Sequence, residues 1–250
     1  MLRYNVDLRS DKNAVLAAVS KDGNELSYAP DFHNDKEVVK AAVSNKGYLL
    51  QSYPIINNDR EVVLAALSNG GSLRYASPEL KADKEIVMAA IRKDGLALKF
   101  ASDELKEDKE VVLTAISNHA SAYELSNLQY DTDVVIAALK NNLSINNLAT
   151  NRLLSDKHIV LSAIENGRKD VFYDCTLKSD KDVVMAAVSR DRYALGSASR
   201  ALQEDKDVIE AAIKYDPSAV LVARNISPRG GTRRRRRKFK SYKRHSNRKL

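Results

Sequence analysis

Hydrophobic positions recur along this chain with a period of about 24 residues. Aspartates mark the period at Asp11, Asp35, Asp59, Asp83, Asp108, Asp131, Asp156, Asp180 and Asp205, with spacings of 23 to 25 residues. Four positions after each aspartate stands Val or Ile, seven positions after it stands Ala, and eight positions after it stands Val, Leu or Ile. Apolar residues at such spacings line one face of an α-helix with 3.6 residues per turn. The pattern therefore predicts nine amphipathic helices, each beginning at an aspartate.

The residues at the two ends of each predicted helix support this assignment. An aspartate at the N-cap accepts hydrogen bonds from the exposed N–H groups of the first turn. A second acid follows two positions later in seven units, where the helix dipole favours negative charge: Glu37, Glu61, Glu85, Glu110, Asp133, Asp182 and Asp207. Each helix is expected to stop near a residue that tolerates the left-handed conformation, and the candidates are Gly23, Gly47, Gly71, Gly95, Asn142 and Gly167.

A shorter apolar stretch follows each turn, as in Leu26-Ser-Tyr-Ala29 and Leu98-Lys-Phe-Ala101. It is long enough for about two helical turns, and a polar link leads from it to the next aspartate. A helix pair this small cannot bury its own apolar face, so successive units must stack. The sequence thus predicts an all-α solenoid of about nine helix-turn-helix repeats. The array spans residues 1–228, with a half-repeat at 1–10 and units that start at the nine aspartates.

The charge of the chain is divided unevenly between this array and the C-terminal segment. The formal net charge is +8, yet residues 229–250 hold 12 Lys or Arg and no acid. The remaining 29 basic and 33 acidic residues give residues 1–228 a net charge of −4. A block of like charges without apolar periodicity is typical of a disordered polybasic tail.

The tail is the candidate binding site for a polyanion. Its cations would bind phosphates by releasing counterions, and its aromatic residues could stack on unpaired bases. The residues expected to bind nucleic acid are Arg229, Arg233, Arg234, Arg235, Arg236, Arg237, Lys238, Phe239, Lys240, Tyr242, Lys243, Arg244, Arg248 and Lys249. RNA, single-stranded DNA and duplex DNA all stay open. So do an acidic protein surface, an anionic membrane surface, and a nuclear localisation signal at Arg233 to Lys238.

Residues with catalytic or metal-binding chemistry are sparse. None of the histidines (His33, His119, His158 and His245) lies near another His or Cys at metal-ligand spacing, so no metal site and no cofactor is expected. Cys175 is the single cysteine and has no histidine near it in the repeat pattern. A lone cysteine suits an intracellular, reducing compartment. The acids are periodic, whereas an active site is usually singular. We expect no enzyme.

One periodic basic position is a second candidate for phosphate binding. The residue after the capping aspartate is basic in eight of the nine units: Lys12, Lys36, Arg60, Lys84, Lys109, Lys157, Lys181 and Lys206. Stacked units would align these residues along one edge of the array. Each is flanked by acids, which favours a solvated helix start over a ridge that follows phosphates.

The unit resembles a known repeat family, domain of unknown function 4116. The hallmark is Asp-Lys-Glu-Val-Val-Leu-Ala-Ala-Val, an Asn-Gly turn, Ala-Leu-x-Tyr-Ala-Ser and Glu-Leu-Lys. The segments 59–82 and 83–107 match it nearly in full, and the resemblance covers roughly residues 1–226. It implies arrays found in protists and in the large DNA viruses that infect them, with no assigned catalytic activity.

These features predict a nonenzymatic scaffold. The array would bind a protein partner, and the tail would bind nucleic acid or another polyanion. The alternative is a structural component of a large assembly, such as a giant-virus particle, with the tail as an anchoring peptide. The location would be the nucleus, the cytoplasm or a virion. No apolar run reaches the 18 residues of a transmembrane helix, so no such segment is expected.

Overall fold

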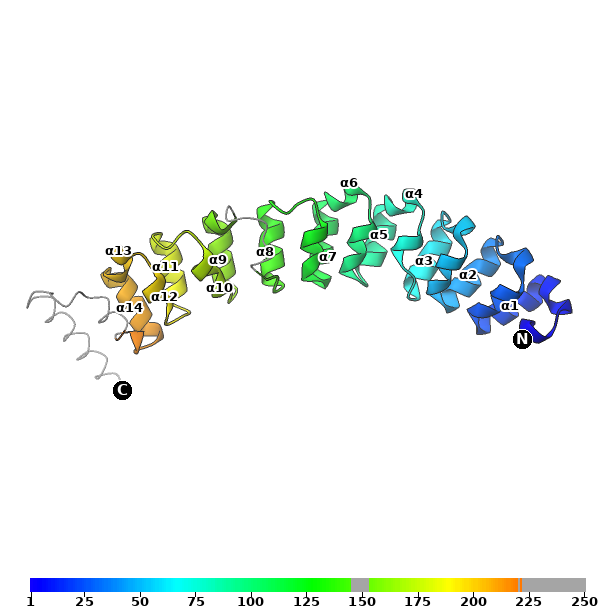
Figure 1. Cartoon of the computed structure of the whole chain (residues 1–250), viewed down its shortest axis with the longest axis horizontal. Coiled ribbons are helices and arrows are strands. Elements are labelled where there is room, and N and C mark those ends of the chain that lie inside the picture. Colours follow the sequence, from blue (N-terminus) through cyan, green and yellow to red (C-terminus); the bar gives the residue numbers. More distant parts are fainter. Residues whose placement is uncertain (145–152, 220, 222–250) are drawn as a thin grey trace, which may run out of the picture. The chain divides into compact units, whose positions relative to one another are not determined.

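The computed structural model describes residues 1–144, 153–219 and 221. These residues form helices and no strands. The chain divides into two compact units, Met1–Leu143 and Ser144–Leu250, and within each of them the helical repeats stack as a solenoid (Figure 1). The predicted all-α repeat fold is therefore confirmed. The predicted tail, residues 229–250, lies outside the described residues.

Each of the nine aspartates begins an α-helix, as predicted. The helices are α1 (Lys12–Lys21), α2 (Lys36–Asn45), α3 (Arg60–Ser68), α5 (Lys84–Ile91), α7 (Lys109–Asn118), α8 (Thr132–Lys140), α9 (Lys157–Glu165), α11 (Lys181–Val188) and α14 (Lys206–Tyr215). In every case the aspartate side chain accepts hydrogen bonds from the backbone N–H groups two and three residues later. This is the N-cap geometry that the sequence predicts.

The second element of most units is a 3-10 helix rather than a short α-helix. In the first compact unit these are η3 (Gly23–Tyr28), η5 (Gly47–Ser52), η7 (Leu73–Tyr75), η8 (Gly95–Phe100) and η9 (Ala120–Leu125). In the second compact unit the corresponding pieces are the short α-helices α10 (Asp170–Asp174) and α12 (Ala194–Ser197). Six residues at three residues per turn give the two turns that the sequence indicates.

A third short helix fills most of the links between units. These helices are η4 (Pro30–Phe32), η6 (Pro54–Ile56), α4 (Pro78–Lys81), α6 (Asp103–Lys106), η11 (Leu153–Ser155) and α13 (Arg200–Gln203). The chain before Asp11 forms η1 (Leu2–Tyr4) and η2 (Asp7–Ser10). Leu2 is fully buried, and η1 packs against η3 while η2 packs against α1. The unit is thus helix, 3-10 helix, short helix.

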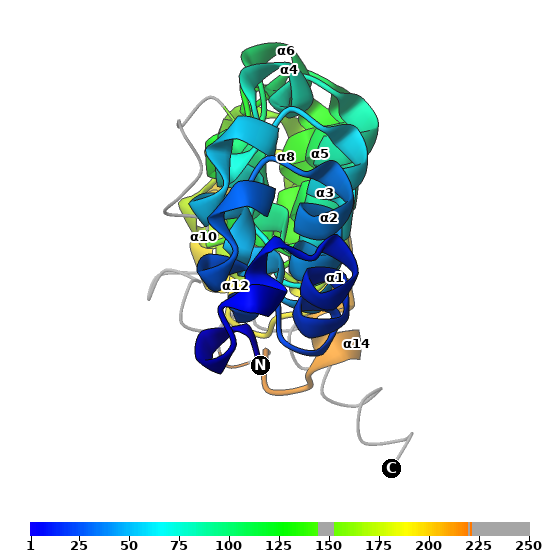
Figure 2. The same cartoon turned by 90° about the vertical axis from the view of Figure 1, so that its right-hand side faces the viewer.

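Packing follows the predicted apolar face. In the first compact unit α1, α2, α3, α5, α7 and α8 each contact the next helix in that order, and in the second unit α9 contacts α11, which contacts α14. Side chains such as Val63, Ala66 and Leu67 are buried between neighbours. Viewed along the stack, α1, α2 and α3 lie on one side of the first unit and the 3-10 helices on the other (Figure 2).

Most of the turn glycines do not have the role that the sequence suggests. Among the described residues φ is positive only at Gly70, Asn142 and Gly167, so the left-handed stop is confirmed at Asn142 and Gly167 and is wrong for the other glycines. A Cβ on Gly23 would lie 2.5 Å from the carbonyl oxygen of Ala42 in the next unit. Glycine is needed there because two units approach closely.

The same reason holds at Gly47 and Gly95, where a Cβ would overlap the carbonyl oxygens of Ala66 and Ala115. Those alanines occupy the position seven residues after the capping aspartate. Gly71 differs, since its Cβ would overlap the Ala66 carbonyl of its own unit. The recurring Gly and Ala are therefore two sides of one contact between neighbouring units.

Candidate interaction surfaces

The basic residue after each capping aspartate joins two units. Lys84 places its Nζ atom 2.8 Å from Asp108, the cap of the next unit. The same atom lies 2.7 Å from Glu110, the acid two residues after that cap, which is called the outer acid below. The same three-residue arrangement, here called a rung, forms seven times in the described residues. The cations are Lys12, Lys36, Arg60, Lys84, Lys109, Lys157 and Lys181.

Each capping carboxylate in a rung serves two purposes. The Oδ1 atom of Asp108 accepts from the N–H groups of Glu110 and Val111 in its own helix, while Oδ2 accepts from Lys84. The hydrogen bond from Lys84 lowers the pKa of Asp108, and the two carboxylates raise the pKa of Lys84. Both groups are therefore charged at neutral pH, and carboxylates of the next unit neutralise the cation of the rung within the protein.

The distribution of the outer acid shows why it is present. Wherever the preceding unit supplies a cation, the position two after the cap is acidic, and this holds for all seven rungs. The position is not acidic in the two units that lack such a cation. These have Asn13 two residues after Asp11, and His158 two residues after Asp156, whose preceding unit has Thr132 at the basic position. The helix dipole alone would favour an acid in all nine units. The acid is thus tied to the rung.

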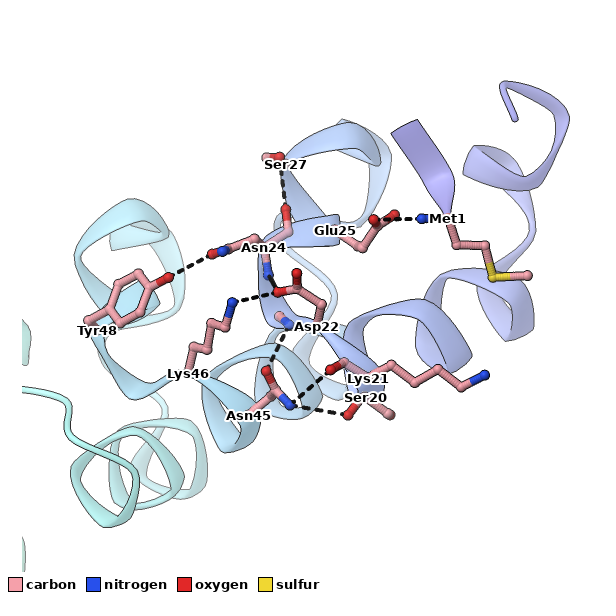
Figure 3. A network of polar contacts seen from close by, with 11 residues as sticks. Met1, Ser20, Lys21, Asp22, Asn24, Glu25, Ser27, Asn45, Lys46 and Tyr48 are labelled. Atoms are coloured by element: carbon pink, nitrogen blue, oxygen red, sulfur yellow. Dashed lines mark hydrogen bonds and ion pairs between the residues drawn. The ribbon is translucent and has the colours of Figure 1, made fainter. Parts of the chain in front are cut away.

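A second set of contacts closes the turns between units (Figure 3). Asn45 accepts from the N–H of Gly23 at 3.0 Å and donates to the carbonyl of Ser20 at 3.2 Å, so its amide bridges to the preceding unit. Lys46 pairs with Asp22 at 2.7 Å, and the Tyr48 hydroxyl donates to Asn24 at 2.8 Å. Asn118 repeats the bridge, accepting from Gly95 and donating to the carbonyl of Arg92.

This bridge was not predicted, although the sequence carries a signal for it. Asn stands ten residues after the capping aspartate in five units, at Asn45, Asn69, Asn118, Asn141 and Asn166. Asn69, Asn141 and Asn166 bond instead to a carbonyl four residues earlier in their own helix. Each of these three precedes a residue with positive φ. The local turn therefore decides whether the asparagine reaches the neighbouring unit.

A known family model matches this chain in segments of about two repeat units each. The model described as Domain of unknown function (DUF4116) matches six times, at residues 11–56, 35–81, 59–106, 83–130, 108–153 and 180–225. These matches cover more than half of the chain. The chain belongs to the DUF4116 family. No curated protein and no solved structure matches it.

Each DUF4116 match spans two successive units, and each of the first four matches overlaps the next one by about one unit. Two units are what a rung or an asparagine bridge requires. Residues 154–179 fall outside every match. The DUF4116 pattern is interrupted in the unit that starts at Asp156, where His158 replaces the outer acid and α10 replaces the 3-10 helix.

Two titratable residues that the sequence singles out, His33 and Cys175, have local partners. His33 forms a hydrogen bond through Nε2 with the Leu26 carbonyl at 3.0 Å and packs edge-on against Tyr53. Cys175 is buried, its Sγ donates to the Phe172 carbonyl, and burial raises the pKa of the thiol. Within the described ranges no group of three His, Cys, Asp or Glu is arranged to hold a metal ion.

The tail residues predicted to bind nucleic acid, from Arg229 to Lys249, lie outside the described residues, as does His245. In the described part of the chain no helix is long and apolar enough to cross a membrane.

Proposed function

We propose that this DUF4116 array is a nonenzymatic scaffold, in which the helical repeats bind a protein partner and the polybasic tail binds nucleic acid. The observation that carries the proposal is the set of seven rungs. They commit seven of the eight periodic cations of the array to carboxylates of the next unit, so this row is poorly suited to bind phosphates. The 12 basic residues of segment 229–250 have no acid among them.

The architecture supports the protein-binding half of the proposal. A stack of similar units offers neighbouring side chains on one face, and repeat arrays commonly use such faces for binding. The acids that recur with the repeat serve as caps and rungs. That arrangement supports a structural use of the acids over acid–base catalysis.

The nucleic-acid half is tested by a salt series on the full chain. Binding of a fluorescent single-stranded oligonucleotide is measured by anisotropy for the natural protein and for a variant with Arg233–Arg237 and Lys238 all changed to Gln. Each phosphate contact to a single strand contributes about 0.7 to the slope of log K against log salt. Six lost cations should therefore weaken binding and reduce the slope by up to about four.

A control removes three cations from the array instead. Lys36→Gln, Lys84→Gln and Lys157→Gln together should leave the slope unchanged, since these cations are bound to carboxylates. If the tail variant keeps both the affinity and the slope of the natural protein, the tail does not bind nucleic acid and this half of the proposal is wrong.

A further inference from the structure

Within Met1–Leu143, one turn between two repeat units differs from the closed turn that Figure 3 shows. It lies between the unit that starts at Asp59 and the unit that starts at Asp83. Lys93 occupies the position that Asn45 and Asn118 hold in their units. Gly70, with φ of +84°, and Gly71 widen the turn that follows α3. The result is a cleft of about 500 Å³, whose lining includes Gly70, Arg74, Tyr75, Lys93, Lys99 and Phe100.

The lining of this cleft is positively charged. Arg74, Lys93 and Lys99 contribute three cations and Asp94 one carboxylate. The Asp94 carboxylate is engaged as the cap of η8, where it accepts from the N–H of Leu96. Lys93 donates to the carbonyl of Ser68. An ammonium group has three N–H donors, so Lys93 keeps donors for a ligand.

The positive charge is specific to this cleft, because the equivalent position in three other repeat units is not basic. Arg74 and Lys99 each come directly after a buried leucine, Leu73 or Leu98, so they hold the same position in adjacent units. Three other units of the same stack have Ser27, Gln51 and Glu124 at that position. In an array that repeats its structural residues, a local departure of this kind points to binding.

Two aromatic rings complete the cleft. The Lys99 Nζ atom lies 4.7 Å from the centre of the Phe100 ring, and the Arg74 Cζ atom lies 6.0 Å from the centre of the Tyr75 ring. Both rings are half-buried, whereas both cations are exposed. The cations therefore stand beside apolar surface, where a carboxylate contact is less screened than in open water.

We propose that this cleft docks a short acidic segment of a protein partner. The volume lies in the range of sites that hold small ligands or a few side chains. Arg74 can receive a carboxylate through two N–H groups, and Lys93 and Lys99 supply further donors. The inference names the partner chemistry for the scaffold function proposed above and rests on it.

A nucleic-acid strand fits this surface less well. A strand that continued along the stack would need cations in the neighbouring units, where the matching positions hold Gln51 and Glu124. A short acidic peptide segment that contacts only these two repeat units does not meet the acidic residues of the other units.

The test uses the full chain with all 12 tail cations changed to Gln, so that the tail cannot bind the probe. The probe is a fluorescein-labelled peptide of glutamates followed by anisotropy, and a single-stranded oligonucleotide is the comparison. We expect saturable peptide binding that falls at least tenfold in the triple variant Arg74→Glu, Lys93→Glu, Lys99→Glu. Hydrogen exchange of segments 68–75 and 93–100 should slow when the peptide is bound.

The charge-matched control changes three exposed cations outside the cleft, Lys21→Glu, Lys140→Glu and Lys214→Glu, and should change affinity less than twofold. A neutral triple variant (Gln at 74, 93 and 99) guards against misfolding and should lose affinity to a smaller extent. Equal losses in the cleft and control variants would overturn the proposal. So would absence of peptide binding, or tighter binding of the oligonucleotide through the same residues. None of these outcomes affects the tail experiment, which tests the nucleic-acid half separately.

Discussion

At the residue scale, the two kinds of turn glycine should respond differently to the same substitution. Gly47 faces backbone atoms of the next unit, whereas Gly70 has positive φ and no atom within 4 Å of the place where a Cβ would lie. Gly47→Asn should therefore lower the free energy of unfolding by about 1–3 kcal/mol, because the units must move apart. Gly70→Asn should cost less, since Asn tolerates the left-handed region.

Denaturant unfolding of both variants, followed by circular dichroism, measures the difference. Equal losses would mean that the turn conformation, and not the contact between units, decides the need for glycine. The comparison also shows what the sequence could reveal at this scale. The caps were predicted correctly because Asp binds N–H groups two and three residues away. The prediction was wrong for Gly23, Gly47 and Gly95 because the carbonyl oxygen that excludes a side chain there belongs to the next unit.

At the element scale, the rungs explain how one helix start supports the next. Asp108→Asn keeps the cap, since Asn caps helices about as well as Asp, but loses the charge that Lys84 requires. It should destabilise the protein at low salt and less at high salt, because ion pairs at the surface are screened. Asp108→Ala should lose the cap as well, at a further cost of about 1 kcal/mol.

Asp11 supplies the matched control for this prediction. It caps α1 in the same way, and in the described residues no lysine or arginine forms an ion pair with it. Asp11→Asn should leave the thermal unfolding midpoint unchanged at low and at high salt. If Asp108→Asn behaves like Asp11→Asn, the rung does not stabilise the stack.

The rungs and the cleft show which features of this scale can be predicted from the sequence and which cannot. The row of basic residues and the acids that flank it are visible in the sequence. That the acids come from the next unit, 22 to 26 residues away, depends on how the units stack, which periodicity alone does not give. Likewise Arg74, Lys93 and Lys99 are ordinary surface cations in the sequence. The widened turn at Gly70 brings them to one cleft.

At the scale of the whole molecule, contacts connect each helix to its neighbours in the stack. In the first compact unit α7 touches α5 and α8, and in the second α9 touches α11. Stability in such an array is a sum of local terms and terms between adjacent units. A weakened helix should therefore affect its neighbours much more than distant units.

This locality gives a prediction that hydrogen exchange can measure. Ile116 in α7 is fully buried, and Ile116→Ala should remove about 2–5 kcal/mol of local stability. Exchange should accelerate in α5, α7 and α8, while α11 and α14 keep their protection. Ile164→Ala, at the same position of α9, should accelerate exchange in α9 and α11 and spare α2 and α3. Uniform acceleration along the chain in either variant would mean that the described residues unfold as one cooperative block, and the additive picture of the array would be wrong.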